Sequence, residues 1–278
     1  MSEPDPGKES LAGAWHLIAG EKVLLIDSKQ RKYLVELEPG SRFHSHSGYV
    51  DHDQLIGQSD GISVKASNGG TFQVLRPTLA DIVVLMPRGA QVIYPKDLGA
   101  ILMVSDIFHG ARVLEAGVGS GALSMALLRA GADVTGYEVR AEFAQRAITN
   151  VEQLLGKDVP YTVRLHDIYE SIEETELDRV LLDVPEPWRA IGHVELAMRP
   201  GGILVSYLPT INQVDALRQA IQRSSFGMAE TFEVLWRTWH IEGLSVRPDH
   251  RMVAHTGFIT HARLMQEPME AHRARRSQ

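Results

Sequence analysis

The sequence contains no cysteine and no long apolar run. Without cysteine, the chain forms neither disulfides nor thiolate zinc sites. No apolar run approaches the length of about 20 residues that crosses a bilayer. The first ten residues, MSEPDPGKES, also lack the basic and then apolar order of a signal peptide. These absences predict a soluble, cytoplasmic protein without a membrane segment.

Positive charge is also scarce relative to negative charge. The chain has 28 lysines and arginines against 35 aspartates and glutamates, which gives a formal net charge of −7. Because polyanions favour basic surfaces, this balance argues mildly against a nucleic-acid partner, although a local basic cleft is compatible with an acidic total. The candidates for such a basic surface are Lys65, Arg76, Arg88, Lys96, Arg237 and Arg247.

Residues 22–77 have the pattern of a small antiparallel β domain. The strand-like segments KVLLID and RKYLVEL flank SKQ, and the segments ISVKAS and TFQVLR flank NGG. Both arrangements predict hairpins, and the second is favoured because Asn-Gly tolerates the positive φ of tight turns. The preceding residues 1–21 are expected to form a flexible N-terminal segment.

Beyond Gly110, apolar runs of strand length alternate with amphipathic segments of helix length. This repeated βα order predicts an α/β fold, in which a parallel sheet has helices on both faces. Near the end, residues 230–243 and 255–264 are two strand-like runs with no helix between them, so one is expected to run antiparallel. The sequence therefore predicts an α/β domain over residues 78–264 and a polar tail over residues 265–278.

A glycine-rich turn, EAGVGSG over residues 115–121, follows the first strand of this α/β region. In the dinucleotide-binding motif a pyrophosphate lies at the helix N-terminus, but here the third glycine comes one residue early and Glu115 precedes the first. A carboxylate at this place repels a pyrophosphate and suits an ammonium or a sulfonium. S-adenosylmethionine carries both, so the turn favours a methyltransferase over a nicotinamide enzyme. The alternative is a purely structural turn.

Two more acidic residues close the next expected strands. Glu138 ends the second strand, where a carboxylate is placed to accept hydrogen bonds from both ribose hydroxyls. Asp167 ends the third strand, where it is placed to accept from the adenine amino group. Three acids along the ligand edge of one open sheet strengthen the interpretation of the turn as a cofactor site.

Several stretches of the sequence are similar to one known family. They include QVIYPKD, VLEAGVGSGALS, LLDVPEPW and the closing WRTWHIEGLSVRP with HTGFITHARL, and the matching parts cover nearly all of residues 22–264. The chain resembles the bacterial and archaeal tRNA (adenine-58-N1)-methyltransferases, in an actinobacterial-like form. The glycine motif alone is common to class I methyltransferases, whereas QVIYPKD and DVPEPW are much more specific.

The resemblance implies a fold, a reaction and an assembly. The expected fold is a Rossmann-like class I S-adenosylmethionine-dependent methyltransferase, with a seven-stranded sheet whose last strand is antiparallel and a small N-terminal β domain. The expected reaction moves a methyl group from S-adenosylmethionine to N1 of adenine 58 in the T-loop of tRNA, in a homotetramer without a metal. The residues expected at the cofactor are Gln91, Glu115, Ala116, Gly117, Val118, Gly119, Ser120, Gly121, Glu138, Val139, Arg140, Phe143, Asp167, Ile168 and Asp183.

Asp183, in LLDVPEPW, is the candidate catalytic carboxylate. Attack through adenine N1 places positive charge on the ring and makes the N6 hydrogens more acidic. A carboxylate that accepts from N6 therefore bonds more strongly in the transition state than in the ground state. Family resemblance gives Asp183 this place, near the methionine part of the cofactor. The alternative is an N-cap aspartate for the following helix.

Tyr94 and Tyr207 match the aromatic positions that flank the target base in the resembled family. A flipped adenine needs walls on which to stack. The alternative for each tyrosine is an ordinary place in the core. Gln91, just upstream in QVIYPKD, is a candidate to hydrogen-bond the methionine part of the cofactor.

The segment around residues 44–53 is rich in histidine and aspartate and invites interpretation as a metal site. An H-x-H pair on a strand places two imidazoles on one face. The sequence has no further cluster at zinc spacing and the expected chemistry needs no metal, so a subunit interface or a polar turn is preferred. The side chains concerned are His44, His46, Asp51, His52 and Asp53.

Two other functions stay open at this point. One is a class I methyltransferase for a small molecule or a protein carboxylate, which has no reason to carry DVPEPW with an N-terminal β domain. The other is a non-catalytic RNA-binding subunit, against which the presence of Glu115, Glu138 and Asp183 argues. Trp236 and Trp239 are expected in the core or in a subunit contact rather than against RNA.

Overall fold

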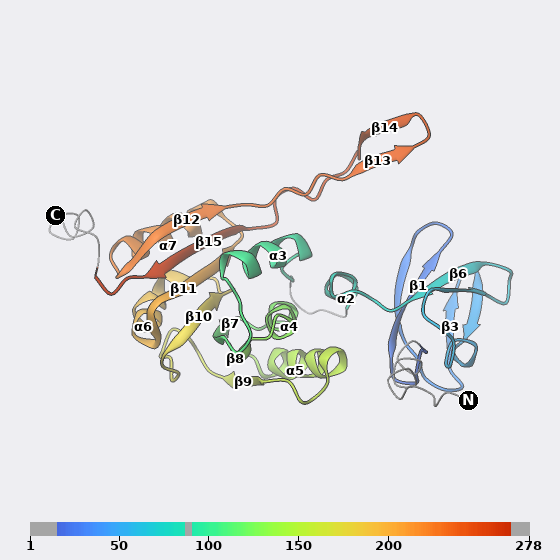
Figure 1. Cartoon of the computed structure of the whole chain (residues 1–278), viewed down its shortest axis with the longest axis horizontal. Helices are drawn as coiled ribbons and strands as arrows, with labels where there is room; N and C mark the ends of the chain where they lie inside the picture. Colours follow the sequence, from blue (N-terminus) through green and yellow to red (C-terminus); the bar gives the residue numbers. More distant parts are fainter. Residues whose placement is uncertain (1–15, 87–90, 268–278) are drawn as a thin grey trace, which may run out of the picture. The chain divides into compact units, whose positions relative to one another are not determined.

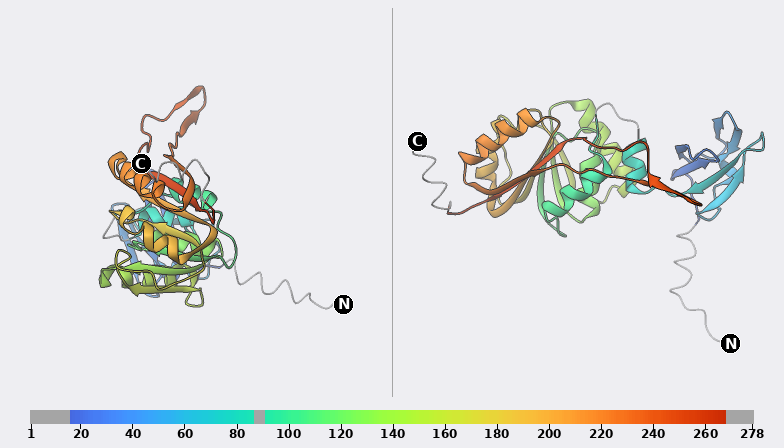
Figure 2. Two further views of the ribbon diagram at one scale, coloured as in Figure 1. Left: turned by 90° about the vertical axis from the view of Figure 1, so that its left-hand side faces the viewer. Right: turned by 90° about the horizontal axis from the view of Figure 1, so that it is seen from above.

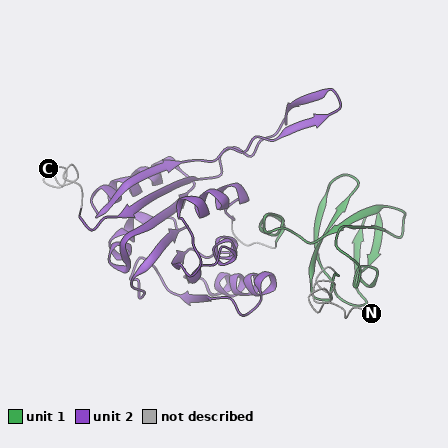
Figure 3. Cartoon of the chain, in the orientation of Figure 1, with its two compact units in different colours: residues 1–87 green, residues 88–278 purple. Residues whose placement is uncertain are grey.

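The computed structural model describes residues 16–86 and 91–267 of the chain. The chain forms two compact units, residues 1–87 and residues 88–278 (Figure 3). The boundary predicted between residues 77 and 78 precedes helix α2 (Leu79–Leu85), which belongs to the first unit. The expected polar tail from residue 265 lies mostly outside the described residues.

The first unit is built on a four-stranded antiparallel sheet in the order β2-β1-β6-β5. Its strands are β1 (Lys22–Asp27), β2 (Lys32–Glu36), β5 (Ile62–Lys65) and β6 (Thr71–Leu75). Both predicted hairpins are confirmed, because β1 pairs with β2 and β5 pairs with β6. Gly69 in the second turn has φ +83°, the left-handed conformation that glycine adopts without strain.

A shorter hairpin and one helical turn complete this unit. The hairpin joins β3 (Arg42–Ser45) to β4 (Gly48–Asp51), and the turn is η1 (His52–Gln54). Alternate residues of the strands point into one apolar cluster, as the period-two pattern of the sequence requires. Its buried members are Leu17, Val23, Leu25, Leu37, Val50, Leu55, Ala66, Phe72 and Val74.

The expectation of a flexible segment through residue 21 is wrong for residues 16–21. The Leu17 side chain has no exposed surface, and its backbone exchanges two hydrogen bonds of 2.8 Å with Gln58 and Gly57. His16 forms an isolated β-bridge with Ser59. Leu17 and Ile18 are adjacent apolar residues, and their local pattern does not show which of the two is buried, so the sequence did not reveal the place of Leu17 in the core. Residues 1–15 lie outside the described part of the chain.

The sheet of the second unit has seven strands in the order β12-β15-β11-β10-β7-β8-β9 (Figure 1). Strands β7 to β11 pair parallel, and β15 runs antiparallel between β11 and β12. The predicted α/β sheet with an antiparallel last strand is therefore confirmed. The strands are β7 (Arg112–Ala116), β8 (Asp133–Glu138), β9 (Tyr161–Leu165), β10 (Leu177–Leu182), β11 (Met198–Leu208), β12 (Phe226–Phe232) and β15 (Phe258–Leu264).

Helices cover both faces of this sheet (Figures 1 and 2). One face carries α3 (Pro95–Val104), α4 (Ala122–Arg129) and α5 (Ala141–Leu155), and the other carries α6 (Ile191–Ala197) and α7 (Ile211–Gln222), with η2 (Pro187–Arg189) beside them. Side chains alternate between these faces along each strand. On β7, Leu114 and Ala116 join the cluster under α6 and α7, whereas Glu115 between them faces α4.

Residues 233–257 leave the sheet as a hairpin arm between β12 and β15. Its tip pairs β13 (Trp239–Glu242) with β14 (Ser245–Pro248), and both views show it projecting beyond the sheet (Figures 1 and 2). The strand-like run expected over residues 230–243 is thus split, because the chain leaves β12 after Phe232. The apolar side chains exposed on the arm are Leu235, Trp236, Trp239, Ile241, Leu244, Val246, Met252 and Val253.

The tryptophans of the arm are therefore not core residues. Trp236 and Trp239 each keep more than half of their surface exposed, at 57% and 56%. Among the described residues, no helix has the length and apolar character that a membrane crossing requires.

Candidate active site

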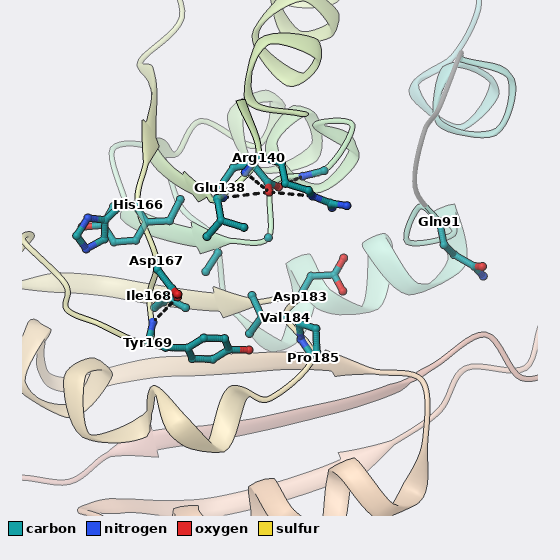
Figure 4. Close-up of a pocket in the computed structure, with 15 residues that line it drawn as sticks. Gln91, Glu138, Arg140, His166, Asp167, Ile168, Tyr169, Asp183, Val184 and Pro185 are labelled. Atoms are coloured by element: carbon teal, nitrogen blue, oxygen red, sulfur yellow. Dashed lines mark hydrogen bonds and ion pairs between the residues drawn. The ribbon is translucent and has the colours of Figure 1, made fainter. Parts of the chain in front are cut away.

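A pocket of about 480 Å³ opens at the carboxyl ends of β7, β8, β9 and β10 (Figure 4). This is the edge at which open α/β sheets bind ligands, and the volume is in the range of roughly 300–1,000 Å³ that small-molecule sites occupy. The lining residues are Gln91, Ala116, Gly117, Gly119, Tyr137, Glu138, Val139, Arg140, His166, Asp167, Ile168, Tyr169, Asp183, Val184 and Pro185.

The three glycines of the turn after β7 have three different physical roles. All have positive φ, at +86° for Gly117, +56° for Gly119 and +82° for Gly121. A Cβ on Gly117 would lie 2.1 Å from the carbonyl oxygen of Asp183. Glycine at this position therefore allows the backbone after β10 to approach the turn closely. A Cβ on Gly121 would lie 3.2 Å from Cα of Ala147 in α5. A Cβ on Gly119 would meet no atom closer than 4.0 Å, and Gly119 lines the pocket. A ligand can therefore approach the backbone of the turn at Gly119.

Glu138 is held at the pocket by backbone N–H groups. Its Oε2 accepts from the amide of Gly119 at 3.1 Å, and its Oε1 accepts from the amides of Val139 and Arg140 at 3.1 Å. The Arg140 guanidinium lies 3.6 Å from Oε1 and over the Phe143 ring, 3.7 Å from its centroid. These bonds fix the carboxylate at the end of β8, where a ribose hydroxyl pair can donate to it.

Asp167 and the residues after it form another wall. The Oδ1 atom of Asp167 accepts from the amide of Tyr169 at 2.9 Å, and Ile168 between them is buried. The Tyr169 ring faces the guanidinium of Arg189 at 4.4 Å, and its hydroxyl accepts from the amide of Glu186. This wall combines an acceptor with apolar and aromatic surface, which suits a heterocyclic base.

Asp183 follows β10 and stands in Figure 4 between Gln91 and the Glu138 side of the pocket. Its amide donates to the carbonyl of Ala116 at 2.9 Å. Burial, with a smaller contribution from the Glu138 charge, raises the pKa of the Asp183 carboxyl to about 7. The N-cap alternative is wrong, because the caps of η2 and α6 are Glu186 and Ala190.

Glu115 does not line the pocket, contrary to its expected place at the cofactor. Its Oε2 accepts from the Ser124 hydroxyl of α4 at 2.6 Å, because strand alternation turns the side chain to that face of the sheet. Its Oε1 is buried and has no hydrogen-bond partner among the described residues. Burial, and then the charges of Asp183 and Glu138, raise the pKa of Glu115 to about 8. Three carboxyl groups around one turn favour a cationic ligand nearby.

Ten of the fifteen residues expected at the cofactor line this pocket, and the other five do not. The ten that line it are Gln91, Ala116, Gly117, Gly119, Glu138, Val139, Arg140, Asp167, Ile168 and Asp183. The five that do not line it are Glu115, Val118, Ser120, Gly121 and Phe143, all of which are buried.

Sequence reasoning missed five lining residues: Tyr137, His166, Tyr169, Val184 and Pro185. Each lies within two positions of a predicted acid at a strand end. That adjacency was the available signal.

Tyr94 and Tyr207 lie outside the lining set. Tyr94 is the N-cap residue of α3, and Tyr207 lies on β11 with its hydroxyl 3.3 Å from Oδ2 of Asp97. Lys96, expected on a basic surface, is instead buried and pairs with Asp97 at 2.8 Å. Arg88 of the same expected surface lies outside the described residues.

Three side chains of the histidine-rich segment form hydrogen bonds or an ion pair within the first unit. The Nδ1 atom of buried His52 accepts from the amide of Glu38, Asp53 accepts from the amide of Gly40, and Asp51 pairs with Arg42. Within residues 16–86 and 91–267, no three histidine, aspartate or glutamate side chains are grouped as metal ligands.

The chain is similar to proteins with assigned functions. Residues 16–64 match the family described as "TrmI-like N-terminal". The chain is 38% identical over 243 residues to "tRNA (adenine(58)-N(1))-methyltransferase TrmI" of Thermus thermophilus, which covers 85% of this chain and 94% of that protein. It is 32% identical over 276 residues to "tRNA (adenine(57)-N(1)/adenine(58)-N(1))-methyltransferase TrmI" of Methanocaldococcus jannaschii, covering 89% and 96% of the two chains.

Two solved structures have the same fold over nearly the whole chain. A protein from Thermotoga maritima, described as a SAM-dependent O-methyltransferase, superposes with a TM-score of 0.88 at 34% identity and covers 93% of this chain and 98% of its own. The tRNA (m1A58) methyltransferase TrmI from Aquifex aeolicus gives a TM-score of 0.80 at 31% identity, covering 91% and 100%. The fold is therefore that of a class I S-adenosylmethionine-dependent methyltransferase with a small N-terminal β domain.

The pocket lies at the carboxyl ends of the parallel strands, the edge at which open α/β sheets bind their ligands. Residues 70–247, which contain the glycine turn, Glu138, Asp167 and Asp183, match the family described as "tRNA methyltransferase complex GCD14 subunit". The chain belongs to this tRNA methyltransferase family.

Proposed function

We propose that this protein transfers a methyl group from S-adenosylmethionine to N1 of adenine 58 in the T-loop of tRNA. The names of its relatives in Thermus and Methanocaldococcus support this reaction. The observation that carries it is the carboxyl group of Asp183, which lines the pocket beside the glycine turn and, among the described residues, has burial and the charge of Glu138, but no lysine or arginine, acting on its pKa. Such a group is available to a cationic cofactor and to an amino group on the target base.

Different residues of the pocket are suited to different parts of the cofactor. Glu138 would accept from the ribose hydroxyls, and the wall of Asp167, Ile168 and Tyr169 would hold the adenine ring. Gln91 and Asp183 would face the methionine part. Glu115, in the layer behind the turn, has an orphaned buried Oε1 and a pKa raised to about 8, and a cationic ligand nearby would favour its charged form. The residues present therefore fit a ligand that has a nucleoside at one end and positive charge at the other.

The protein has to align two reactants rather than activate a nucleophile. Bound S-adenosylmethionine supplies an electrophilic methyl group on a sulfonium. As N1 of adenine takes this methyl group, positive charge passes to the adenine ring and the sulfur becomes a neutral thioether. Asp183 accepts a hydrogen bond from the N6 amino group, and this bond strengthens as the ring becomes cationic. Tyr94 and Tyr207 hold the flipped base between them.

The proposed assembly is a homotetramer that works in the cytoplasm, where tRNA is modified. The exposed apolar side chains of the hairpin arm support an association of this kind, because large apolar side chains gathered on one exposed segment are typical of an interaction surface. Arg237 and Arg247 lie on the same arm and are the best remaining candidates for phosphate contacts. Both features make the arm the part of the second unit that is best suited to contact other molecules.

A direct test uses labelled S-adenosylmethionine and an unmodified tRNA transcript. The proposal expects label in 1-methyladenosine after complete digestion, and none with a transcript in which guanosine replaces adenine 58. Methylation of a small molecule or a protein carboxylate, as the name of the Thermotoga protein suggests, together with no label in tRNA, would overturn the proposal. Binding of tRNA without binding of the cofactor would instead indicate a non-catalytic RNA-binding subunit.

A further inference from the structure

Tyr207 is held on two sides by residues that the pocket does not include. Its ring lies against the backbone of Gly257, where a Cβ would come within 2.3 Å of the ring atom Cζ and 2.6 Å of the hydroxyl oxygen. Gly257 does not have the left-handed φ that favours glycine. The absence of a side chain at residue 257 is therefore required by the Tyr207 ring and not by the backbone conformation.

The hydroxyl of Tyr207 meets a buried polar network. It donates to Oδ2 of Asp97 at 3.3 Å, and the hydroxyl of Thr256 donates to the same oxygen at 2.6 Å. The ammonium of Lys96 pairs with Oδ1 of Asp97 at 2.8 Å and donates to Oγ1 of Thr256 at 2.5 Å. Burial, and then the charges of Asp97 and Asp183, raise the pKa of Tyr207. The phenol therefore keeps the proton that it donates.

The network joins parts of the chain that are far apart in sequence. Lys96 and Asp97 lie in the first turn of helix α3, whose N-cap residue is Tyr94. Thr256 and Gly257 lie on the returning limb of the hairpin arm, and Lys96 also donates to the carbonyl of Val234 on the outgoing limb at 2.6 Å. One lysine thus fastens both limbs of the arm to the helix that follows Tyr94.

A second bridge strengthens the same root of the arm. The Nδ1 atom of His255 lies 2.9 Å from Oε2 of Glu233, and its Nε2 lies 3.0 Å from the carbonyl of Pro209. Glu233 belongs to the outgoing limb, and Pro209 follows Tyr207 by two residues. The segment that carries Tyr207 is therefore anchored to the arm both before and after the end of β11.

A buried ion pair is weak evidence for stability, because desolvation offsets much of its attraction. Asp97 has no exposed surface, and replacing Asp97 and Lys96 together by apolar residues of similar size often changes stability little, whereas removing Asp97 alone would leave the Lys96 ammonium buried without its partner. Fixed hydrogen bonds do, however, impose a single orientation on the groups that they join. The network is thus better explained by the orientation of Tyr207 than by the free energy of unfolding.

We propose that Asp97, Thr256 and Gly257 are positioning residues that fix Tyr207 as a wall for the target adenine. This inference rests on the proposed function, in which Tyr207 contacts the flipped base. Asp97 and Thr256 set the hydroxyl end of the side chain, Gly257 supports its ring, and Lys96 holds the three to both limbs of the arm. The root of the arm thereby becomes part of the site that receives the tRNA base.

A matched pair of variants at residue 256 tests the hydroxyl side. Thr256→Val has nearly the shape of threonine without the hydroxyl, whereas Thr256→Ser restores the hydroxyl. We expect the single-turnover rate of tRNA methylation at saturating cofactor to fall about tenfold in the valine variant and to stay within about twofold in the serine variant. Cofactor affinity should be unchanged in both. Equal rates in the two variants would overturn the role of the hydroxyl.

A second test addresses the ring through Gly257→Ala, with Gly99→Ala as the control. Gly99 lies on α3 and an added Cβ there meets nothing within 4 Å, so its variant should keep the wild-type rate. Displacement of a positioned group by about 1 Å can lower a rate by about 10², and we expect Gly257→Ala to lose between ten- and a hundredfold. In a Tyr207→Ala background the same change should have no further effect, because the residue that it displaces is gone.

The double variant separates positioning from a general structural role. If Gly257→Ala lowers the rate equally in both backgrounds, it does not act through Tyr207 and the inference is wrong. A wild-type protein that fails to methylate tRNA would contradict the proposed function itself, before any variant is compared. The two failures are therefore distinguishable in one set of assays.

Discussion

The cofactor pocket and the root of the hairpin arm both contain buried acidic groups, but these groups are compensated differently. At the pocket, Glu138 accepts from three backbone amides and lies 3.6 Å from the Arg140 guanidinium. Asp183, in contrast, has no cation among the described residues that lowers its pKa. At the arm root, Asp97 is paired with Lys96 and accepts from two hydroxyl groups. An uncompensated carboxylate is ready for a cationic ligand, whereas a compensated one fixes the groups around it.

This difference separates the effects that substitutions should have. A change in the pocket removes an interaction with cofactor or substrate, so it should alter binding or rate directly. A change at the arm root should act through the orientation of Tyr207 or through association with other molecules. We expect the largest effects at the pocket.

The largest effect is expected for Asp183→Asn. Asparagine keeps the size of the side chain, and its oxygen still accepts a weaker bond from the adenine amino group, but the negative charge is gone. Loss of one electrostatic contact of this kind lowers a rate by about 10²–10³. The measurement is single-turnover methylation of tRNA at saturating cofactor, beside a direct titration of cofactor binding.

Asp215→Asn is a suitable control, because Asp215 is exposed on α7. If Asp183 mainly answers charge on the adenine ring, the rate should fall much more than the cofactor affinity. A parallel loss of affinity would place its main role at the cofactor. A near wild-type rate would remove Asp183 from the mechanism.

The next effect concerns affinity and is expected for Glu138→Ala. The ribose hydroxyls would lose a charged acceptor, which is worth about 1.5–3 kcal/mol, or roughly ten- to 150-fold in the dissociation constant. Calorimetric titration with the cofactor measures this directly. Glu142→Ala, in the first turn of α5, is the matched control and should bind as the wild type does. Equal affinity in the two variants would exclude Glu138 from the ribose site.

The same comparison shows what the sequence could and could not predict. The sequence predicted that Glu138 and Asp183 line the pocket, because a residue at the carboxyl end of a parallel strand lies at the ligand edge of the sheet. Glu115 does not line the pocket, because it lies inside a strand, where alternation decides the face and turns the side chain toward Ser124. A motif identifies a residue type at a position, but the face of the strand decides whether the side chain reaches the ligand.

The arm root was not predictable for a different reason. Lys96 pairs with its neighbour Asp97, yet their other partners, Tyr207 and Thr256, lie more than a hundred residues away. A lysine on a helix is usually exposed, and nothing local marks this one as buried. The course of the hairpin arm was also missed, because the apolar run after β12 resembles a strand of the sheet. Only tertiary contacts distinguish a strand that stays in a sheet from one that leaves it.

A smaller effect is expected from pH. Because the pKa of Asp183 is raised to about 7, the fraction of its carboxylate form increases about tenfold between about pH 6 and pH 8. Methylation at subsaturating cofactor should rise by this factor over that range, since kcat/KM follows the free enzyme. At saturating cofactor the profile should shift to lower pH, because the positive charge of the ligand favours the carboxylate. A profile that Asp183→Asn leaves unchanged would contradict this assignment.

The raised pKa also has a consequence for folding. A carboxyl group whose pKa is higher in the folded state than in the unfolded state binds more protons when folded, so its contribution to stability falls as pH rises from about 4 to about 7. Asparagine does not titrate. The melting temperature of Asp183→Asn relative to wild type should therefore be higher at about pH 8 than at about pH 5, with no cofactor present.

The smallest effect on the pocket is expected from a change at the tip of the hairpin arm. Leu244 is completely exposed in the single chain, so Leu244→Glu removes no buried contact and should not alter folding. If the arm associates with a second copy, a charge at its tip must be desolvated in that interface, and the assembly should dissociate. Light scattering would then report a smaller species for Leu244→Glu, while Leu196→Glu, at another exposed leucine on α6, should assemble as the wild type does.

Cofactor affinity should be the same in all three proteins, because the arm tip contributes no residue to the pocket. A loss of cofactor affinity in Leu244→Glu would show that the two regions are coupled, and an unchanged mass would show that the arm does not hold the assembly together.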